Sequence, residues 1–374
     1  MKKILITGGH ITPALAVIYE LERGDYKILF IGRKYFHAYD TFPSFEYQLI
    51  KKRNIPFFDL PSPKLQRENI FSLFAIPVGL LLAVIKSLQI IQKENPDCIV
   101  SFGGYIALPV AIAAKISHIP ILTHEQTMVM GLANRFIAKI SDVVCLSWKN
   151  TKYVSSDKEI VTTGNPVRPE FTKGGNKPSF WDKLPSLPKI YITGGSQGSH
   201  FINRLIDDNL DSLLVSYVLI HQTGSPTSYN DFVYANQKKQ QAPPDIRRRY
   251  IIFSHLEESE VAFIMENADL LIGRSGANTL SEILHCRIPS ILIPLPWAGG
   301  SEQEVHADFI QSHGLGTKIL QKEATINKLT DEIARINKNK NLIKSKFSDV
   351  EKHSPGQNPA FLIRKEIDRL TAPF

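Results

Sequence analysis

The strongest constraint on the fold is a pattern that opens both halves of the chain: a short apolar strand, a glycine-rich turn and an amphipathic helix. Residues Ile4–Thr7 lead into Gly8-Gly9, and Lys189–Thr193 lead into a second glycine turn at Gly194–Ser199. The tetrapeptide Ile-Thr-Gly-Gly occurs at both places. Strands that alternate with helices form parallel sheets with helices on both faces. The sequence therefore predicts two α/β domains, each a doubly wound parallel sheet.

Further short apolar runs between helical segments predict the other strands of the two sheets. In open α/β sheets, ligands bind beyond the carboxyl ends of the strands. We therefore expect the glycine turns of both domains to face a cleft. The predicted strands lie at Lys27–Ile31, Cys98–Phe102, Ile119–His124, Val143–Ser147, Val218–His221, Tyr250–Phe253, Asp269–Gly273 and Ser290–Pro294.

Length and local composition indicate where the domains meet. At about 150 residues per domain, a chain of 374 residues corresponds to two domains or three. Residues 166–188 contain five prolines and a pair of glycines, which is a linker composition. We expect an N-terminal domain over residues 1–165, the linker over 166–188 and a C-terminal domain over 189–355. Residues 356–374 are expected to form a helix that packs back on the N-terminal domain.

Charge and cysteine content narrow the classes of partner. The chain has 44 Lys and Arg against 36 Asp and Glu, and the net charge of +8 favours an anionic partner. The basic run Arg247–Arg249 comes without a nucleic-acid recognition motif, so we expect no nucleic acid. Cys98, Cys145 and Cys286 are widely spaced, which favours neither disulfides nor a zinc site and indicates a reducing, cytoplasmic compartment. The chain has no Asp-x-Asp pair, and we expect neither a metal nor a cofactor.

The turn Gly194–Ser199 is the strongest indication of chemistry. Glycines let the backbone approach a ligand closely, and a helix N-terminus offers free N–H groups and partial positive charge, which suits a diphosphate. The turn lacks the Gly-Lys-Ser/Thr of a P-loop and is no Gly-x-Gly-x-x-Gly fingerprint. Taken alone, it is equally compatible with a plain turn between strand and helix.

Two single residues are further candidates. Glu282 falls in the second turn of a helix that follows another predicted strand, where its carboxylate could accept both hydroxyls of a ribose. The alternative is an ordinary solvated carboxylate. His10 follows the first glycine turn, where an imidazole could take a proton from an attacking hydroxyl. The alternative is a helix-capping or structural histidine.

Together these motifs resemble the lipid II-forming glycosyltransferases of family 28, which have the GT-B fold of two Rossmann-like domains. The resemblance covers nearly the whole chain. It rests on seven motifs in the family's order, namely Thr7-Gly8-Gly9-His10 with Pro13–Ala16, Gly103-Gly104-Tyr105, His124-Glu125-Gln126, Gly164–Arg168, Gly194–Gly198, Arg274–Ala277 with Ser281-Glu282, and Glu302-Gln303.

The resemblance implies an inverting, metal-independent enzyme of peptidoglycan synthesis that moves N-acetylglucosamine from UDP-N-acetylglucosamine to the C4 hydroxyl of lipid I. It implies His10 as the general base. In the C-terminal domain, it implies donor contacts by Arg168, Ser196, Gln197, Gly198, Leu256, Glu282, Glu302 and Gln303. In the N-terminal domain, it implies acceptor contacts by Gly8, Gly9, Gly103, Gly104, Tyr105, His124, Glu125, Gln126 and Thr127.

The sequence departs from the family's pattern in several places. The first glycine turn is about three residues shorter, because Gly8-Gly9 leads directly into His10. Thr127 stands where the family has asparagine, and Glu302 stands where the family has the first of two glutamines. Two alternatives therefore stay open: a related UDP-sugar transferase with another lipid acceptor, such as diacylglycerol, and a catalytically impaired homologue that binds UDP-sugar.

Residues 69–85 form a long stretch without charge, flanked by Lys64, Arg67 and Lys86. The stretch is shorter than the roughly 20 apolar residues of a membrane-spanning helix. It is compatible with a core helix packed on the sheet, and also with an apolar patch whose basic rim docks on an anionic bilayer surface. The resemblance implies docking through residues 64–86, and hence a peripheral protein on the cytoplasmic side of the cell membrane.

Overall fold

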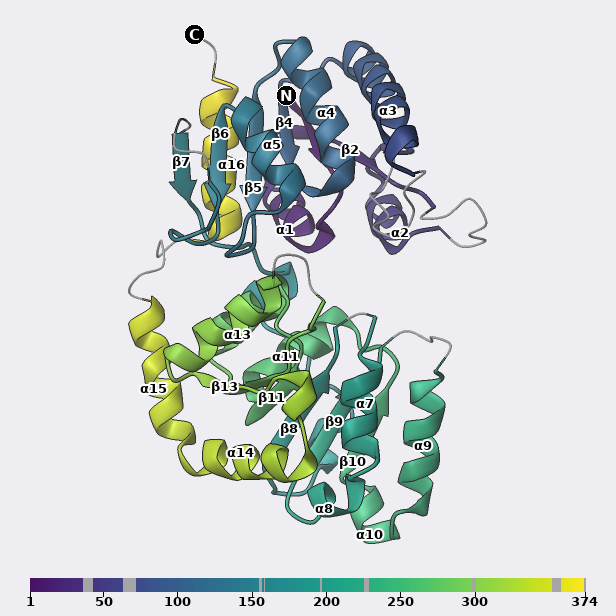
Figure 1. Ribbon diagram of the computed structural model, residues 1–374, viewed down its shortest axis with the longest axis vertical. Helices are drawn as coiled ribbons and strands as arrows, with labels where there is room; N and C mark the ends of the chain where they lie inside the picture. Colours follow the sequence, from purple (N-terminus) through teal and green to yellow (C-terminus); the bar gives the residue numbers. More distant parts are fainter. Residues whose placement is uncertain are drawn as a thin grey trace. The chain divides into compact units, whose positions relative to one another are not determined.

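The structure is a computed structural model that describes residues 1–35, 43–62, 72–154, 157, 159–195, 197–224, 229–297, 301–351 and 358–372. The chain divides into two compact units. Unit 1 consists of Met1–Pro166 together with Gln357–Phe374, and unit 2 consists of Val167–Gly356. Each unit is a sheet covered by helices (Figure 1).

Unit 1 contains a parallel sheet of seven strands in the order β3-β2-β1-β4-β5-β6-β7. The central strand β1 pairs with β2 on one side and β4 on the other, so Ile4 lies between Ile28 and Cys98. The strand order reverses between β1 and β4, and this is the switch point at which open α/β sheets bind ligands. The strands are β1 Lys2–Thr7, β2 Tyr26–Gly32, β3 Phe57–Asp59, β4 Cys98–Ser101, β5 Ile121–Glu125, β6 Val143–Leu146 and β7 Glu159–Thr162.

Helices cover both faces of this sheet because alternate residues of its strands point to opposite faces. Ile4 and Ile6 belong to the core under α1 and α16, whereas Leu5 belongs to the core under α3 and α4. The final helix α16 packs against α1, and Arg364 on α16 forms an ion pair of 2.8 Å with Glu20. The helices are α1 Ile11–Leu21, α2 Phe45–Lys52, α3 Ser72–Glu94, α4 Gly104–Ile116, α5 Leu132–Ile140 and α16 Pro359–Leu370.

Unit 2 repeats the plan with six parallel strands in the order β10-β9-β8-β11-β12-β13. Its order reverses between β8 and β11, which places the glycine turn after β8 at the second switch point. The strands are β8 Lys189–Thr193, β9 Val218–Gln222, β10 Tyr250–Phe253, β11 Leu270–Gly273, β12 Ser290–Leu292 and β13 Gly316–Lys318. The helices are α6 Pro169–Lys173, α7 His200–Asp207, α8 Leu210–Leu214, α9 Asp231–Gln241, α10 Pro244–Arg247, α11 Glu258–Asn267, α12 Ala277–Cys286, α13 Glu302–Ser312, α14 Ile326–Lys338 and α15 Lys340–Glu351.

The predicted fold class, two parallel-sheet α/β domains, is confirmed. Three short strands, β3, β7 and β13, were not predicted from the sequence. Each lies at an edge of its sheet and has only three or four residues. An edge strand is partly open to solvent, so its sequence lacks the continuous apolar run of the central strands.

Candidate functional site

The glycine turn between β8 and α7 has a shape that side chains would prevent. Gly198 has a φ of +77°, and a Cβ at this position would overlap the carbonyl oxygen of Thr223 at the end of β9. Ser199 caps α7 by accepting a hydrogen bond from the Ile202 N–H, and the first turn of the helix has no acidic residue. The turn therefore brings backbone and the positive end of a helix dipole to the switch point.

A cavity of about 950 Å³ opens beside this turn. Among the predicted donor contacts, Gln197, Gly198 and Gln303 line it, while Ser196 lies outside the described residues. The Gln303 side chain is held in place because its Oε1 accepts a hydrogen bond of 3.0 Å from the Leu295 N–H. Ligand pockets span roughly 300–1,000 Å³, so the cavity can take a ligand of nucleotide-sugar size.

Arg274 gives this cavity a fixed positive charge. Its guanidinium donates hydrogen bonds to the carbonyl oxygen of Ile293 at 2.9 Å and to Oε1 of Gln321 at 2.9 Å. Burial lowers the pKa of Arg274 to about 10, which leaves it cationic near neutral pH. The sequence marked Arg274 as part of a motif but gave it no role, because its partners come from the residues just after β12 and from Gln321.

Arg168 and Glu282, both predicted donor contacts, form an ion pair that was not predicted from the sequence. Nε of Arg168 lies 2.8 Å from Oε1 of Glu282, and Glu258 lies 3.9 Å from the same guanidinium. Burial acts to lower the pKa of Arg168, but the charge of Glu282 and its hydrogen bond raise the pKa above its ordinary value. Glu258 is partly buried too, and this burial raises the pKa of its carboxyl. The Glu282 carboxylate is therefore a largely buried group with a cationic partner.

The other predicted donor contacts lie elsewhere in unit 2. Leu256 sits between β10 and α11 with its side chain buried, which leaves only its main chain for a ligand. Glu302 is the first residue of α13 and is half-buried. The cavity beside the glycine turn is not lined by Leu256, Glu302, Arg168 or Glu282. Their roles toward the donor stay predictions.

In unit 1, the two predicted glycine turns touch at the switch point. Gly9 has a φ of +136°, and a Cβ there would overlap the carbonyl oxygen of Gly103. Gly103 is the N-cap of α4, and Gly104 begins the helix. Tyr105 is half-buried, and its carbonyl oxygen accepts a hydrogen bond of 3.3 Å from Ser62. The turns thus bring the N-termini of α1 and α4 together, and helix N-termini favour anions.

His10 stands at the N-cap of α1, but its side chain makes no capping hydrogen bond. The residue is exposed. Although solvent reaches this side chain, the protein around its position desolvates the imidazole and lowers the pKa of His10, while the carboxylate of Glu125 acts in the opposite direction. A lowered pKa keeps the imidazole neutral near pH 7, which is the form that can accept a proton.

The predicted acceptor residues 124–127 are buried and bonded within the chain. Burial lowers the pKa of His124 to about 4, and its Nε2 lies 3.1 Å from the Gly164 carbonyl oxygen. The Glu125 carboxylate accepts hydrogen bonds from Thr127, from the Gly131 N–H and from Asn134. Gln126 is buried as well. These contacts hold the loop after β5, and any contact with an acceptor stays a prediction.

Glu46, which the sequence analysis did not single out, lies against the first glycine turn. A Cβ on Gly8 would overlap its Oε1, and the backbone N–H groups of Arg33 and Gly9 donate hydrogen bonds to its carboxylate. Burial raises the pKa of Glu46 from 4.5 to about 7, although those hydrogen bonds act to lower it. No local pattern marked this residue, because α2 reaches the turn only through the fold.

Replacing Glu46 by glutamine should make the protein less sensitive to alkaline pH. Folding raises the pKa of Glu46. The stability that the protonated Glu46 carboxyl contributes is therefore fully present below about pH 4.5 and is lost as the pH rises through about 7. Between about pH 5 and pH 8, the free energy of unfolding of the parent protein should fall by about 2–3 kcal/mol more than that of Glu46→Gln. Urea titrations measure this, with exposed Glu266→Gln as the control; equal pH dependence of parent and Glu46→Gln would contradict it.

Comparisons of the sequence and the fold with known proteins agree with this two-unit architecture. Residues 7–145 match the glycosyltransferase family 28 N-terminal domain, and residues 189–355 match the glycosyltransferase family 28 C-terminal domain. A protein of Clostridium botulinum (strain Langeland / NCTC 10281 / Type F) is 30% identical over 376 residues, covering 98% of this chain and 99% of that relative. It is named UDP-N-acetylglucosamine--N-acetylmuramyl-(pentapeptide) pyrophosphoryl-undecaprenol N-acetylglucosamine transferase.

Two further relatives agree. A Clostridium novyi (strain NT) protein of the same name is 31% identical over 347 residues, covering 90% of this chain and 91% of the relative. The crystal structure of Acinetobacter baumannii MurG superposes with a TM-score of 0.72 at 25% identity, covering 98% of this chain and all of the other.

Two parallel α/β units, together with the matches to both domain models, make the chain a glycosyltransferase of the GT-B class. Matches to both domain models extend over most of the sequence. The chain belongs to glycosyltransferase family 28, and the resemblance found in the sequence is confirmed. No group of His, Cys, Asp and Glu side chains suited to a metal occurs in the described ranges.

Proposed function

We propose that the protein transfers N-acetylglucosamine from UDP-N-acetylglucosamine to the C4 hydroxyl of lipid I, forming lipid II, with inversion at the anomeric carbon. The observation that carries the proposal is the similarity to transferases named for this reaction along 98% of the chain. The cavity beside the glycine turn and the Arg168–Glu282 pair support it, because a UDP-sugar offers a diphosphate and a ribose to match.

The reaction needs two contributions from the chain, a base and stabilisation of the leaving phosphate. The acceptor hydroxyl loses its proton to His10 while its oxygen forms a bond to the anomeric carbon. The bond from that carbon to the distal phosphate oxygen breaks, and its electron pair leaves with UDP. The N–H groups of the turn and of α7, together with Arg274, face the charge that develops on the phosphate, which lowers the barrier through preorganised electrostatics.

The test is release of UDP by the purified protein. With lipid I and UDP-N-acetylglucosamine present, we expect UDP and lipid II in equal amounts. A protein that leaves lipid I unchanged but glycosylates another lipid would contradict the proposed acceptor. UDP binding without any transfer would indicate the catalytically impaired homologue.

A second acceptor class is favoured by one observation. The first glycine turn is short, and the Glu46 carboxyl fills the space over Gly8 and accepts a hydrogen bond from the Gly9 N–H. In its ionised form, which at a pKa of about 7 makes up about half of the population at neutral pH, this carboxyl repels an acceptor diphosphate. A neutral acceptor such as diacylglycerol would avoid that repulsion, so a panel that includes diacylglycerol separates the two acceptors.

The helix α3 suits contact with a membrane surface. One face of α3 is buried in the core of unit 1 and carries Ala83, Val84, Ile90 and Ile91. On the opposite face, Val78, Leu81, Leu82 and Ile85 are 44–61% exposed. Residues 64–71 of the predicted docking segment 64–86 lie outside the described residues. Among the residues that are described, no helix is both long and apolar enough to cross a bilayer.

We therefore propose that α3 lays this exposed face on an anionic bilayer, with Lys86 near the phosphates, at the cytoplasmic side of the cell membrane. Such attachment would place the enzyme where its lipid-linked acceptor lies. Amphipathic helices bind in this way through buried apolar area and attraction to anionic lipid.

Replacing Leu81 and Leu82 by glutamate should weaken vesicle binding about 100-fold, since two buried leucines contribute roughly 3 kcal/mol. Co-sedimentation with vesicles that contain phosphatidylglycerol measures the effect. Leu342→Glu is the matched control, because Leu342 is 59% exposed but lies in unit 2. Equal binding of all variants would contradict docking through α3.

A further inference from the structure

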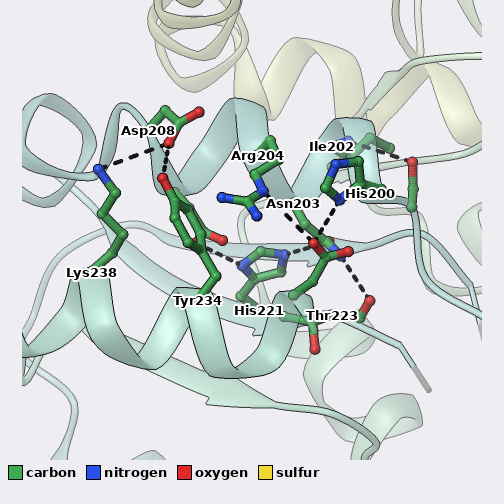
Figure 2. A network of polar contacts seen from close by, with 12 residues as sticks. His200, Ile202, Asn203, Arg204, Asp208, His221, Thr223, Tyr234 and Lys238 are labelled. Atoms are coloured by element: carbon green, nitrogen blue, oxygen red, sulfur yellow. Dashed lines mark hydrogen bonds and ion pairs between the residues drawn. The ribbon is translucent and has the colours of Figure 1, made fainter. Parts of the chain in front are cut away.

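A histidine–aspartate pair lies at the edge of the cavity, in a polar network that no sequence motif indicated (Figure 2). His200 is the first residue of α7, directly after the glycine turn, and Asp231 is the first residue of α9. Nδ1 of His200 lies 2.7 Å from Oδ1 of Asp231. The imidazole also stacks on Tyr229, with ring centroids 3.9 Å apart. The ring is therefore held both at its edge and on its face.

The rest of the network fixes the carboxylate of Asp231. The fully buried Asn203 donates hydrogen bonds of 2.9 Å to Oδ2 of Asp231 and to the carbonyl oxygen of Thr223. Its own Oδ1 lies 3.0 Å from Nε2 of the buried His221. Asn203 on α7 therefore contacts both His221 on β9, as Figure 2 shows, and Asp231 at the start of α9. A carboxylate held this firmly can orient His200.

The other nitrogen of His200 is available to a ligand. No residue in the described part of the chain forms a hydrogen bond with its Nε2, and the side chain is 38% exposed. His200 lines the same cavity as the glycine turn. Arg204, one helical turn further, also lines the cavity and lies 3.9 Å from Asp231. The acidic Asp208 lines it too, but it is bound by Tyr234 and lies 3.9 Å from Lys238.

We propose that His200, oriented by Asp231, binds the distal phosphate of the UDP-sugar by donating a hydrogen bond from Nε2 to a phosphate oxygen. This inference rests on the proposed function. With the Asp231 carboxylate at Nδ1 and a phosphate oxygen at Nε2, each ring nitrogen faces an acceptor, so both N–H groups donate. No bond is made or broken by His200. It would bind UDP as well as the sugar nucleotide, because both carry the distal phosphate.

Calorimetry with UDP and with UMP tests this assignment, because UMP lacks the distal phosphate. His200→Ala should weaken UDP binding about tenfold or more, because the change removes a hydrogen bond to the charged distal phosphate. UMP binding should change by less than about twofold. Asp231→Asn should shift UDP binding in the same direction by a smaller factor, since it acts through His200. His313→Ala, which removes an exposed imidazole from the end of α13, should leave both affinities unchanged.

Two results would overturn the inference while leaving the proposed function intact. Unchanged UDP affinity in His200→Ala would remove the phosphate contact. Equal losses for UDP and UMP would indicate that His200 only supports the structure of unit 2. A parent protein that binds neither nucleotide would instead contradict the proposed function, and this inference with it.

Discussion

Replacing His10 by alanine should lower kcat by a factor of about 100 or more, the usual contribution of a general base. The KM for the UDP-sugar should stay near its parent value, because His10 belongs to unit 1 and the predicted donor contacts belong to unit 2. Initial rates of UDP release with saturating acceptor measure both constants. A kcat within a few-fold of the parent value would contradict the role of base.

The pH profile gives this prediction a second readout. A base must be unprotonated in the free enzyme, so the acidic limb of kcat/KM reports its pKa. Because the pKa of His10 is lowered, activity should persist below the ordinary range of histidine. The acidic limb of the kcat/KM profile should be absent in His10→Ala. His118→Asn is the matched control, because His118 is an exposed histidine of unit 1 with a φ of +56°, which asparagine tolerates.

The sequence predicts best what is local. The central strands carry unbroken apolar runs such as Ile4–Ile6, and the glycine turns that follow three of them mark the ligand-binding edge of each sheet. These features need no knowledge of distant residues. Gly198 is an example: its motif marked a turn that needs glycine, and the structure shows why, because a Cβ there would overlap the Thr223 carbonyl oxygen, whereas the predicted approach to a ligand stays a prediction.

What the sequence did not predict depends on contacts between distant residues. Arg168 and Glu282 are 114 positions apart, and each was assigned to the donor separately although they bind one another. His200 and Asp231 are 31 positions apart and come from two helices. Glu46 reaches Gly8 only because α2 packs beside β2. Such pairs leave no periodic pattern, so only the folded sheet reveals them.

Replacing Glu282 by alanine should have two separable effects, one on binding and one on stability. Loss of two hydrogen bonds to the ribose hydroxyls should raise the dissociation constant for UDP about 100-fold. The same change leaves Arg168 largely buried without its closest partner, and breaking a buried pair in this way costs roughly 3–5 kcal/mol of unfolding free energy. Calorimetry measures the first effect and urea denaturation the second.

The double variant Arg168→Ala with Glu282→Ala distinguishes these effects. Removing both partners leaves no unpaired buried charge, so part of the lost unfolding free energy should return. Affinity for UDP should not return, because no carboxylate is left to accept the ribose hydroxyls. Glu282→Gln keeps the shape of the side chain and should fall between the parent and Glu282→Ala in both measurements. If the double variant recovered UDP affinity together with stability, Glu282 would serve only to neutralise Arg168, and its assignment to the ribose would be wrong.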